Sequence, residues 1–542
     1  MSAPRALLFT RVRLWPEPEV RADAVLVEDG VIAAVGASDE LRLLNPNATV
    51  INAAGATLTP GLCDAHLHFV PWARARRQPD LSGAASREEA LERVRAGLAA
   101  VPGDLPLSGR GWNADAWRDA PDLASLDAVT GDRPVLLWRH DFHTYWVNSA
   151  ALRAAGVTRE TPDPEGGRFD RDASGALTGL VREHAVRAFA KLEAQAGPEV
   201  EPALLDDAAA ALHALGITCV HDFQRGAMDF ALMHSLATRR RLRVLQMVDE
   251  AQLEWLSLEG RASGDGDAWF RIGALKLFAD GTLGSRTAAM LAPYTDVAGS
   301  GMTLIPPDSL RAIVARAANK GFACAIHAIG DAAVRHALDA FAACDAARTR
   351  RLPPRIEHVQ LLDPADLPRF AKLGVTASMQ PQHCVSDIPA ARAAWGERVA
   401  HSYPWRALLD GGATLAFGSD APVEPPFAAL GLHAATRRCA PGASGASGAF
   451  VPEQAITLEE ALAAYTSGAA AAAGGFGVSR LRAGDEADLV LWEADLFLTE
   501  TERLPDSRPA VTVLGGEIVY VSPRATAVTG VTAAVAGTRD RS

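Results

Sequence analysis

The chain has 542 residues, of which 49% are hydrophobic and 22% charged, a composition typical of a globular protein. Its formal net charge of −12 gives no support for nucleic-acid binding, because proteins that bind nucleic acids present basic surfaces to the phosphates. No stretch approaches the run of about 18 apolar residues that a membrane helix requires, so we expect no membrane span. The length predicts roughly two to four domains, or one large barrel with attached segments.

The cysteines and the N-terminus indicate a cytoplasmic protein. None of the 6 cysteines forms a C-x-x-C pair. Cys63, Cys219 and Cys324 lie in apolar runs, where cysteine behaves as a small buried hydrophobic residue. The N-terminal residues show neither a long apolar core nor a small-residue cleavage site. We therefore expect reduced thiols and a cytoplasmic location.

Both ends of the chain have the texture of short β-strands. The N-terminal runs are ALLFTRVRLW and ADAVLVEDGVIAAVG, with a hairpin turn expected at Glu28-Asp29-Gly30. A similar texture returns in ADLVLWEADLF and AVTVLGGEIVYV. We expect residues 1–57 and 477–525 to form one small composite β-sandwich. Residues 526–542 lack aromatic side chains, which is typical of a poorly ordered tail.

Residues 58–476 alternate short apolar runs with Ala-, Leu- and Arg-rich helical stretches. The runs include GITCVHDF, RIGALKLFADG, FACAIHAIGD, RIEHVQL, GVTASMQP and TLAFGSDAP. Near-continuous apolar strands separated by helices are typical of a parallel sheet that is covered on both faces. We therefore expect an α/β fold with a (β/α)8 TIM-like barrel. A doubly wound sheet is the alternative, which no GxGxxG or Walker-type loop supports.

A segment at about residues 70–215 interrupts the strand–helix rhythm. It contains the tryptophan-rich stretches GWNADAW and LLWRHDFHTYW and a hairpin-like piece, GGRFDRDASGALTG. We expect it to be an insertion over the barrel mouth.

Several predicted strands end in a side chain that could hold a metal ion. These side chains are His66, His68, Lys276, His327, His358 and Asp420. Barrel enzymes place their active sites at the C-terminal ends of the strands, so these side chains should meet. His66 and His68 are two apart on one strand and therefore point to the same face.

The spacing between these residues agrees with a barrel of about 30 residues per strand–helix unit. His327 and His358 are about one unit apart, and His358 and Asp420 about two. Lys276, His327, His358 and Asp420 are thus expected on strands four, five, six and eight, with GVTASMQP as the seventh. The distance from His68 to Lys276 exceeds three units, and the insertion accounts for the surplus.

Lys276 requires a different chemistry, because an ammonium group offers no lone pair to a metal. Burial in an apolar strand favours the neutral amine, which can add carbon dioxide to form a carbamate with two oxygens. Such a carbamate could bridge two divalent ions. The alternative is a lysine that reaches the surface or pairs with an acid such as Asp280.

At these residues the chain resembles the metal-dependent amidohydrolase superfamily, and within it the YtcJ-like and N-substituted formamide deformylase branch. The matching pieces are TPGLCDAHLH, KLFADGTLGSRTAAM, IHAIGDAAV, RIEHVQ and LAFGSDAPV. The resemblance implies a barrel, a β-sandwich built from both termini and a centre of two divalent ions. His66, His68 and Asp420 would hold one ion, and His327 and His358 the other. N-carboxylated Lys276 would bridge them. Zinc is the usual metal, and histidine and carboxylate ligands suit it.

The expected reaction is hydrolysis of a C–N bond in an amide, N-substituted formamide or cyclic amide by a metal-bound hydroxide. Asp420 would be the catalytic residue that passes a proton from water to the leaving nitrogen. A single-metal deaminase and an ester or lactone hydrolase remain alternatives. A deaminase site often has a glutamate soon after the fifth-strand histidine, where this chain has Asp331. A non-catalytic scaffold is a further alternative, although such proteins typically lose ligands.

Four further residues are candidates for binding the substrate. Trp112 and His143 come from the insertion, and the many tryptophans there suggest an apolar or aromatic small molecule. His143 could donate to a developing oxyanion. His221 and Asp280 lie near the ends of their strands. For Trp112, His143 and His221, packing is the alternative role. The family resemblance suggests a homodimer and leaves the oligomeric state open.

Overall fold

The computed structural model divides into two compact units. It describes residues 6–17, 22–100, 103, 105–114, 117–139, 144–164, 167–196, 200, 202–224, 226–344, 351–443 and 448–524. One unit comprises Met1–Phe69 with Ala209–Ser542, and the other Val70–Ala208. The residue range of the second unit, Val70–Ala208, is close to the range of about 70–215 that was expected for the insertion. Its predicted place over the barrel mouth stays a prediction.

The first unit contains the predicted barrel. Eight parallel strands form one sheet in the order β19-β18-β17-β16-β15-β14-β13-β7. They are β7 (Leu62–Leu67), β13 (Ile217–Asp222), β14 (Arg243–Val248), β15 (Phe270–Phe278), β16 (Cys324–Ala328), β17 (Arg355–His358), β18 (Thr376–Met379) and β19 (Thr414–Phe417). The chain order of the strands is also their order around the sheet, as in a (β/α)8 barrel. The predicted fold class is therefore confirmed.

Hydrogen bonds join the first strand of this sheet to the residues that follow the last strand. Asp420 N donates to His66 O at 2.6 Å, and His68 N donates to Ala421 O at 2.8 Å. The carboxylate of Asp64 accepts from Ser419 N at 2.9 Å and from Ser419 Oγ at 2.6 Å. These bonds nearly close the barrel, and they bring the C-terminal end of β7 beside Asp420.

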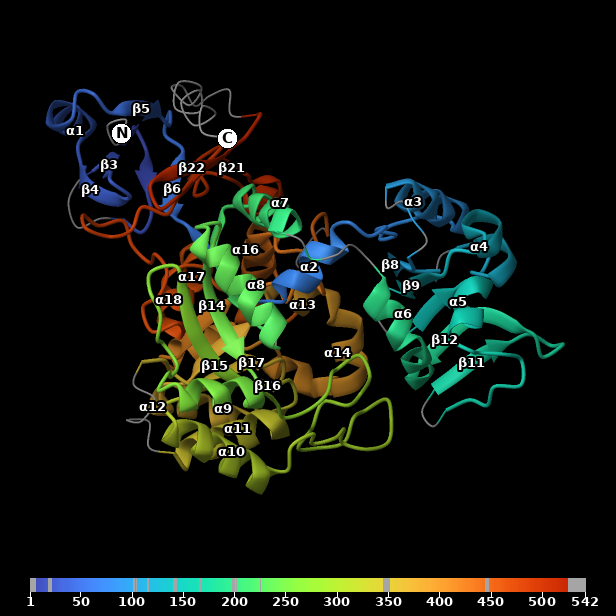
Figure 1. Ribbon diagram of the computed structural model, residues 1–542. Helices are drawn as coiled ribbons and strands as arrows, with labels where there is room; N and C mark the ends of the chain where they lie inside the picture. The colour runs from blue at the N-terminus through green and yellow to red at the C-terminus, as the bar shows by residue number, and fades with distance from the viewer. Residues whose placement is uncertain are drawn as a thin grey trace. The chain divides into compact units, whose positions relative to one another are not determined.

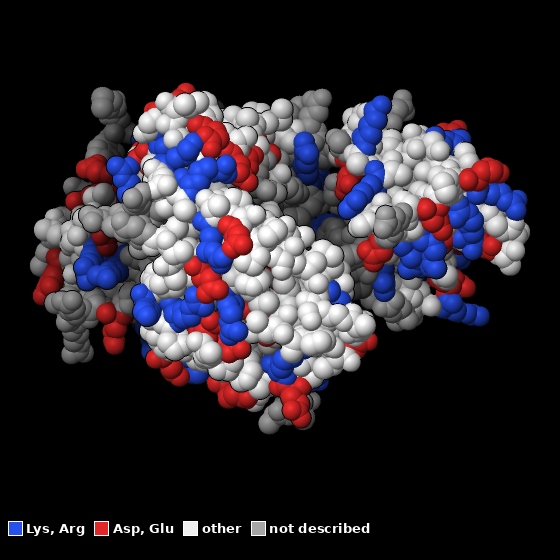
Figure 2. Space-filling model, turned by 90° about the horizontal axis from the view of Figure 1, so that it is seen from below, with Lys and Arg blue, Asp and Glu red and all other residues white. Residues whose placement is uncertain are grey.

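Helices cover the outside of the sheet (Figure 1). Those between β13 and β19 are α8 (Ala227–Thr238), α9 (Glu250–Leu258), α10 (Pro307–Asn319), α11 (Asp331–Ala342), α12 (Leu367–Leu373), α13 (Pro381–Ser386), α14 (Ile388–Trp395) and α15 (Trp405–Asp410). After β19 come α16 (Ala428–Arg437), α17 (Leu458–Ala464) and α18 (Ser467–Ala472). Acidic and basic side chains are interspersed on the face in Figure 2. Ion pairs such as Arg316–Glu250 join α10 to α9.

The two ends of the chain build a β-sandwich, as predicted. One sheet has the order β4-β3-β1-β5, and the other β2-β6-β20-β21-β22. The strands are β1 (Leu7–Thr10), β2 (Arg13–Leu14), β3 (Ala24–Glu28), β4 (Val31–Gly36), β5 (Thr49–Asn52), β6 (Thr57–Pro60), β20 (Leu489–Trp492), β21 (Pro509–Leu514) and β22 (Glu517–Val521). Their inward faces share one apolar core, which includes Phe9 and Val25 from one end and Leu489 and Val511 from the other. The exact limits at residues 57 and 477–525 stay predictions, and residues 526–542 lie outside the described residues.

The second unit is built on a five-stranded sheet of order β11-β12-β10-β9-β8. Its strands are β8 (Leu107–Trp112), β9 (Val135–Arg139), β10 (Thr144–Val147), β11 (Gly167–Arg171) and β12 (Leu177–Glu183). The antiparallel pair β11–β12 is the predicted glycine-rich hairpin. Helices α3 (Arg87–Ala100), α4 (Leu123–Thr130) and α5 (Ser149–Ala154) belong to this unit. Among the described residues, none of the helices combines the length and the hydrophobicity of a membrane-spanning segment.

Candidate metal centre

Three predicted ligands meet where β7 and β19 end. His66 Nε2 lies 3.6 Å from Asp420 Oδ1, and His68 Nε2 lies 3.4 Å from the same oxygen. One ligand atom each from His66, His358 and Asp420 lies within 4.8 Å of the others, close enough to share one ion. Asp420 has a φ of 59°, an uncommon value for a residue other than glycine, and the hydrogen bond from its N–H to His66 O holds this turn.

The two histidines from the fifth and sixth strands lie beside this group. The ring of His358 is 5.1 Å from that of His66 and 4.6 Å from that of His327, measured between centroids. All three imidazoles are buried. The strand-end rule therefore placed side chains from β7, β16, β17 and the end of β19 in one region.

Lys276 points into the same part of the barrel from β15. Its side chain is 3% exposed, and Nζ lies 4.7 Å from the ring centroid of Phe223 and 4.8 Å from that of Phe278. Burial is the main cause that lowers the pKa of His66 and His327, and the charge of Lys276 is the second. All six predicted ligand side chains thus reach one end of the barrel.

The hydrogen bonds of the imidazoles leave one nitrogen of each ring available to a cation. His66 Nδ1 donates to Glu357 Oε2 at 2.7 Å, and His358 Nδ1 donates to Gln380 Oε1 at 2.8 Å. His327 Nε2 donates to Gly281 O at 2.9 Å. Each acceptor is an oxygen, so the other ring nitrogen carries the lone pair when the histidine is neutral.

The protonation states of these groups also fit a divalent cation. Burial lowers the pKa of His66 to about 4 and of His327 to about 3, and it lowers the pKa of His358 as well. Burial opposes ionisation of Asp420, but His66 and the other imidazoles outweigh it and hold the pKa of the carboxyl well below its usual value. Neutral imidazoles and an ionised carboxylate are the forms that bind metals.

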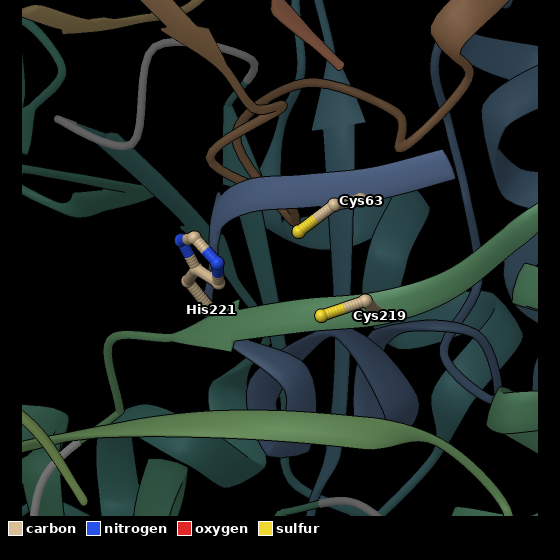
Figure 3. A group of neighbouring side chains, drawn as sticks. All are labelled: Cys63, Cys219 and His221. Carbon is tan, nitrogen blue, oxygen red and sulfur yellow. The ribbon is translucent and has the colours of Figure 1, made fainter. Parts of the chain in front are cut away.

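A second histidine-containing group lies inside the barrel, and it suits a metal less well. Figure 3 shows Cys63 and Cys219 facing each other from β7 and β13, with His221 beside them. Arg355 Nη1 donates to His221 Nδ1 at 3.0 Å. The hydrogen of a neutral His221 then sits on Nε2, so neither ring nitrogen offers a lone pair to a cation. Burial and the neighbouring Cys219 raise the pKa of Cys63, which keeps the thiol protonated.

Two of the predicted substrate residues are buried in the first unit. His221 is fully buried in the barrel interior, which fits the packing alternative. Asp280 accepts three backbone N–H groups, from Ala289, Ile329 and Gly330. Burial raises the pKa of Asp280 to about 7. Its three bonds join the loop after β15 to the end of β16, so Asp280 helps to shape the rim of the site.

The other two substrate candidates belong to the second unit. Trp112 is 3% exposed, packs near Trp117 and Trp146, and donates from Nε1 to Leu137 O at 2.8 Å. It is therefore part of the core of its own unit, and its predicted contact with a substrate stays a prediction. His143 lies outside the described residues.

Several residues that sequence reasoning did not select contribute to the site. Glu357 and Gln380 hold His66 and His358, and Phe223 stacks on His66 with 3.7 Å between centroids and 7° between planes. His383 Nε2 lies 3.9 Å from Asp420 Oδ2. The side chain is buried, and its Nε2 has no hydrogen-bond partner among the described residues. His383 lies on α13, shortly after the seventh strand ends at Met379, so a search just beyond the strand ends could have found it.

Comparison with known proteins agrees with this fold. The model of a family described as the amidohydrolase family matches residues 49–520. The chain belongs to the amidohydrolase family. Residues 24–48 also match an imidazolonepropionase-like composite domain of bacteria. The predicted family is thus confirmed, and the protein is a hydrolase.

Relatives match this amidohydrolase along most of its length. It is 32% identical to YtcJ of Bacillus subtilis, over 92% of this chain and 96% of that protein. It is 27% identical to the N-substituted formamide deformylase of Arthrobacter pascens, over 92% of this chain and 95% of the enzyme. A solved metal-dependent hydrolase from Pyrococcus horikoshii is 26% identical, with a TM-score of 0.75 over 92% of this chain and 99% of that chain.

Proposed function

We propose that this amidohydrolase is a metal-dependent enzyme that hydrolyses the C–N bond of a small amide, N-substituted formamide or cyclic amide. The observation that carries the proposal is the convergence of His66, His68 and Asp420. Asp420 Oδ1 lies 3.6 Å from His66 Nε2 and 3.4 Å from His68 Nε2. The named activity of the Arthrobacter pascens relative supports the choice of bond.

Two divalent ions, with zinc the best chemical fit, would be held by side chains of this chain. His66, His68 and Asp420 would hold one ion, and His327 and His358 the other. Lys276, buried between aromatic rings, would carry a carboxyl group from carbon dioxide, and its two oxygens would join both positions. A divalent ion in such a site lowers the pKa of water toward neutrality and polarises a carbonyl group.

Asp420 performs the proton transfers in the proposed reaction. Its carboxylate is ionised at neutral pH and accepts a proton from the attacking water, whose oxygen forms a bond to the carbonyl carbon. The C–N bond then breaks, and Asp420 returns the proton to the leaving nitrogen. The products are a carboxylic acid, or formic acid from a formamide, and an amine. The hydrogen bond from Asp420 N to His66 O orients the carboxylate for both steps.

The test compares metal content and activity in the wild type, Asp420→Asn and Lys276→Ala. A panel of amides, formamides, hydantoins and esters is assayed with and without chelator. We expect Asp420→Asn to lose activity and Lys276→Ala to lose metal as well. Lys372→Ala is the matched control, because Lys372 is an exposed lysine on α12. Full activity with two ions retained in both Asp420→Asn and Lys276→Ala would refute the mechanism.

The same measurements separate the alternatives. A single ion per chain without turnover of any amide would favour a deaminase, and turnover of esters alone would indicate an ester or lactone hydrolase. Asp331 accepts from the backbone N–H groups of Leu291 and Ala332, so this carboxylate anchors a loop. A protein that binds no metal and hydrolyses none of the panel would be a scaffold.

A further inference from the structure

A buried carboxylate accepts a hydrogen bond from His66, a proposed metal ligand on the first strand of the barrel. Glu357 on β17 is fully buried, and its Oε2 accepts from His66 Nδ1 at 2.7 Å. Glu357 Oε1 accepts from Arg355 Nε at 2.6 Å, so both carboxylate oxygens have a partner. This contact joins the sixth strand to the first, and it sets which nitrogen of His66 faces Asp420.

Arg355 is held rigidly across the barrel interior. Its guanidinium donates to Ala65 O at 2.8 Å, to Ser378 Oγ at 2.6 Å and to His221 Nδ1 at 3.0 Å, in addition to Glu357. These partners come from β7, β18 and β13. A guanidinium held in this way stabilises the negative charge of Glu357 and fixes the orientation of its carboxylate.

The two histidines of the second metal position have neutral acceptors. His358 Nδ1 donates to the amide oxygen of Gln380 at 2.8 Å, and His327 Nε2 donates to the backbone oxygen of Gly281 at 2.9 Å. Asp280 Oδ1 is further from His327 Nε2, at 3.5 Å, and already accepts from Ile329 N. A carboxylate partner makes an imidazole a stronger metal donor than an amide or carbonyl partner does.

We propose that Glu357 is a positioning residue of the metal centre. It keeps the Nε2 lone pair of His66 on the cation, and it makes the position held by His66 and His68 the tighter of the two. This inference rests on the proposed function, and it adds the order in which the two ions bind. The ion at His66 binds first and dissociates last. The neutral partners of His358 and His327 leave the second position weaker.

A purely structural ion pair is the competing role for Arg355 and Glu357, and the chain contains a matched control. Arg243 on β14 and Asp488 form another buried arginine–carboxylate pair, with Nε donating to Oδ2 at 2.6 Å and Nη2 to Oδ1 at 3.0 Å. The other hydrogen-bond partners of this pair include Ala268 O and Glu486. None of them is a predicted ligand. Asp488→Asn therefore removes a buried carboxylate charge of the same kind without changing a residue that contacts the proposed metal centre.

The experiment measures how tightly each metal equivalent is held. The purified wild type, Glu357→Gln and Asp488→Asn are loaded with zinc and titrated with a competing chelator. Cobalt-substituted samples are examined by visible absorption. We expect two affinities in the wild type. Glu357→Gln should weaken the tighter one by about 10-fold to 100-fold and change the cobalt spectrum. Asp488→Asn should lower thermal stability and leave both affinities and the spectrum unchanged.

A second variant covers the case in which Glu357→Gln does not fold because Arg355 loses its partner. The double variant Arg355→Met with Glu357→Leu removes both charges together, which is better tolerated than removing one. It should show the same loss of affinity. Wild-type affinity and spectrum in a folded Glu357 variant would overturn the positioning role and leave the proposed function standing. A wild type that binds no metal would overturn the proposed function itself.

Discussion

Glu357 and His358 are consecutive residues, yet both side chains enter the barrel interior. Glu357 binds His66, and His358 binds Gln380 and lies beside His327. Neighbours on a regular strand point to opposite faces. His358 has a φ of 77° and Val359 a φ of 44°, so the chain turns at the strand end and brings both side chains inward. Such a conformation costs of order 1–3 kcal/mol and persists because surrounding contacts hold it.

Chelation should remove both activity and stability. In the proposed centre, three buried imidazoles with free lone pairs and an ionised carboxylate would bind a cation only in the folded state. At a free metal concentration of 100 times the dissociation constant, one ion adds about 2.7 kcal/mol to the free energy of unfolding. Thermal melts and assays before and after dialysis against a chelator measure both effects. Restoration by zinc, cobalt or manganese is expected. Equal melting curves with and without chelator would contradict the prediction.

His383→Asn should reduce kcat by about 100-fold while metal content stays the same. The Nε2 of His383 lies 3.9 Å from Asp420 Oδ2, is buried, and has no hydrogen-bond partner among the described residues. It is therefore available to bond the oxygen or nitrogen of a substrate. The matched control is His433→Asn on α16, another buried histidine, for which neither ring nitrogen has a hydrogen-bond partner among the described residues. Similar losses of kcat in both variants would show that His383 acts through packing.

Ser419→Ala should destabilise the seam between the first and last strands. The Ser419 hydroxyl donates to Asp64 Oδ2 at 2.6 Å and accepts from Ala421 N at 3.0 Å. Removing it leaves buried polar groups without a partner, at a cost of about 1–3 kcal/mol in the free energy of unfolding. Urea denaturation measures this loss. Ser386→Ala is the control, because that hydroxyl bonds carbonyls within its own helix, α13. An equal effect of both substitutions would argue against a special role for the seam.

His213 should make stability fall in mild acid. It lies at the end of α7 (Pro202–His213), where burial lowers its pKa to about 4, and its Nε2 donates to Arg241 O at 2.7 Å. The unfolded chain, with a pKa near 6.5, binds the proton first. The free energy of unfolding therefore decreases as pH falls from about 6.5 toward about 4. The contribution of His213 is of order 2 kcal/mol between about pH 7 and about pH 5.

The measurement compares urea denaturation at these two pH values in the wild type and His213→Gln. Glutamine can keep the bond to Arg241 O, and it does not titrate. The variant should lose less stability than the wild type on acidification, by the amount assigned to His213. The same pH dependence in both proteins would exclude His213 as its cause.

The sequence by itself determined the barrel, the sandwich from both termini and the strand ends on which the candidate ligands lie. Alternating apolar strands and helices specify layers, and spacing along the chain counts strands, so Lys276, His327, His358 and Asp420 could be assigned to strands four, five, six and eight. These features depend on local periodicity and chain length. The hairpin at Asp29 and Gly30, both with positive φ, follows from local turn chemistry in the same way.

The tertiary structure alone decided which partner holds each ligand. Glu357 meets His66 across 291 positions of sequence, and Gln380 meets His358 across 22. Period-two alternation predicts that His358 and Glu357 point apart, and a positive φ overrides it. Pairings of this kind depend on the register between strands and on a strained backbone turn. Neither the register nor the turn can be recognised from local composition, because these side-chain contacts depend on the tertiary structure of the barrel.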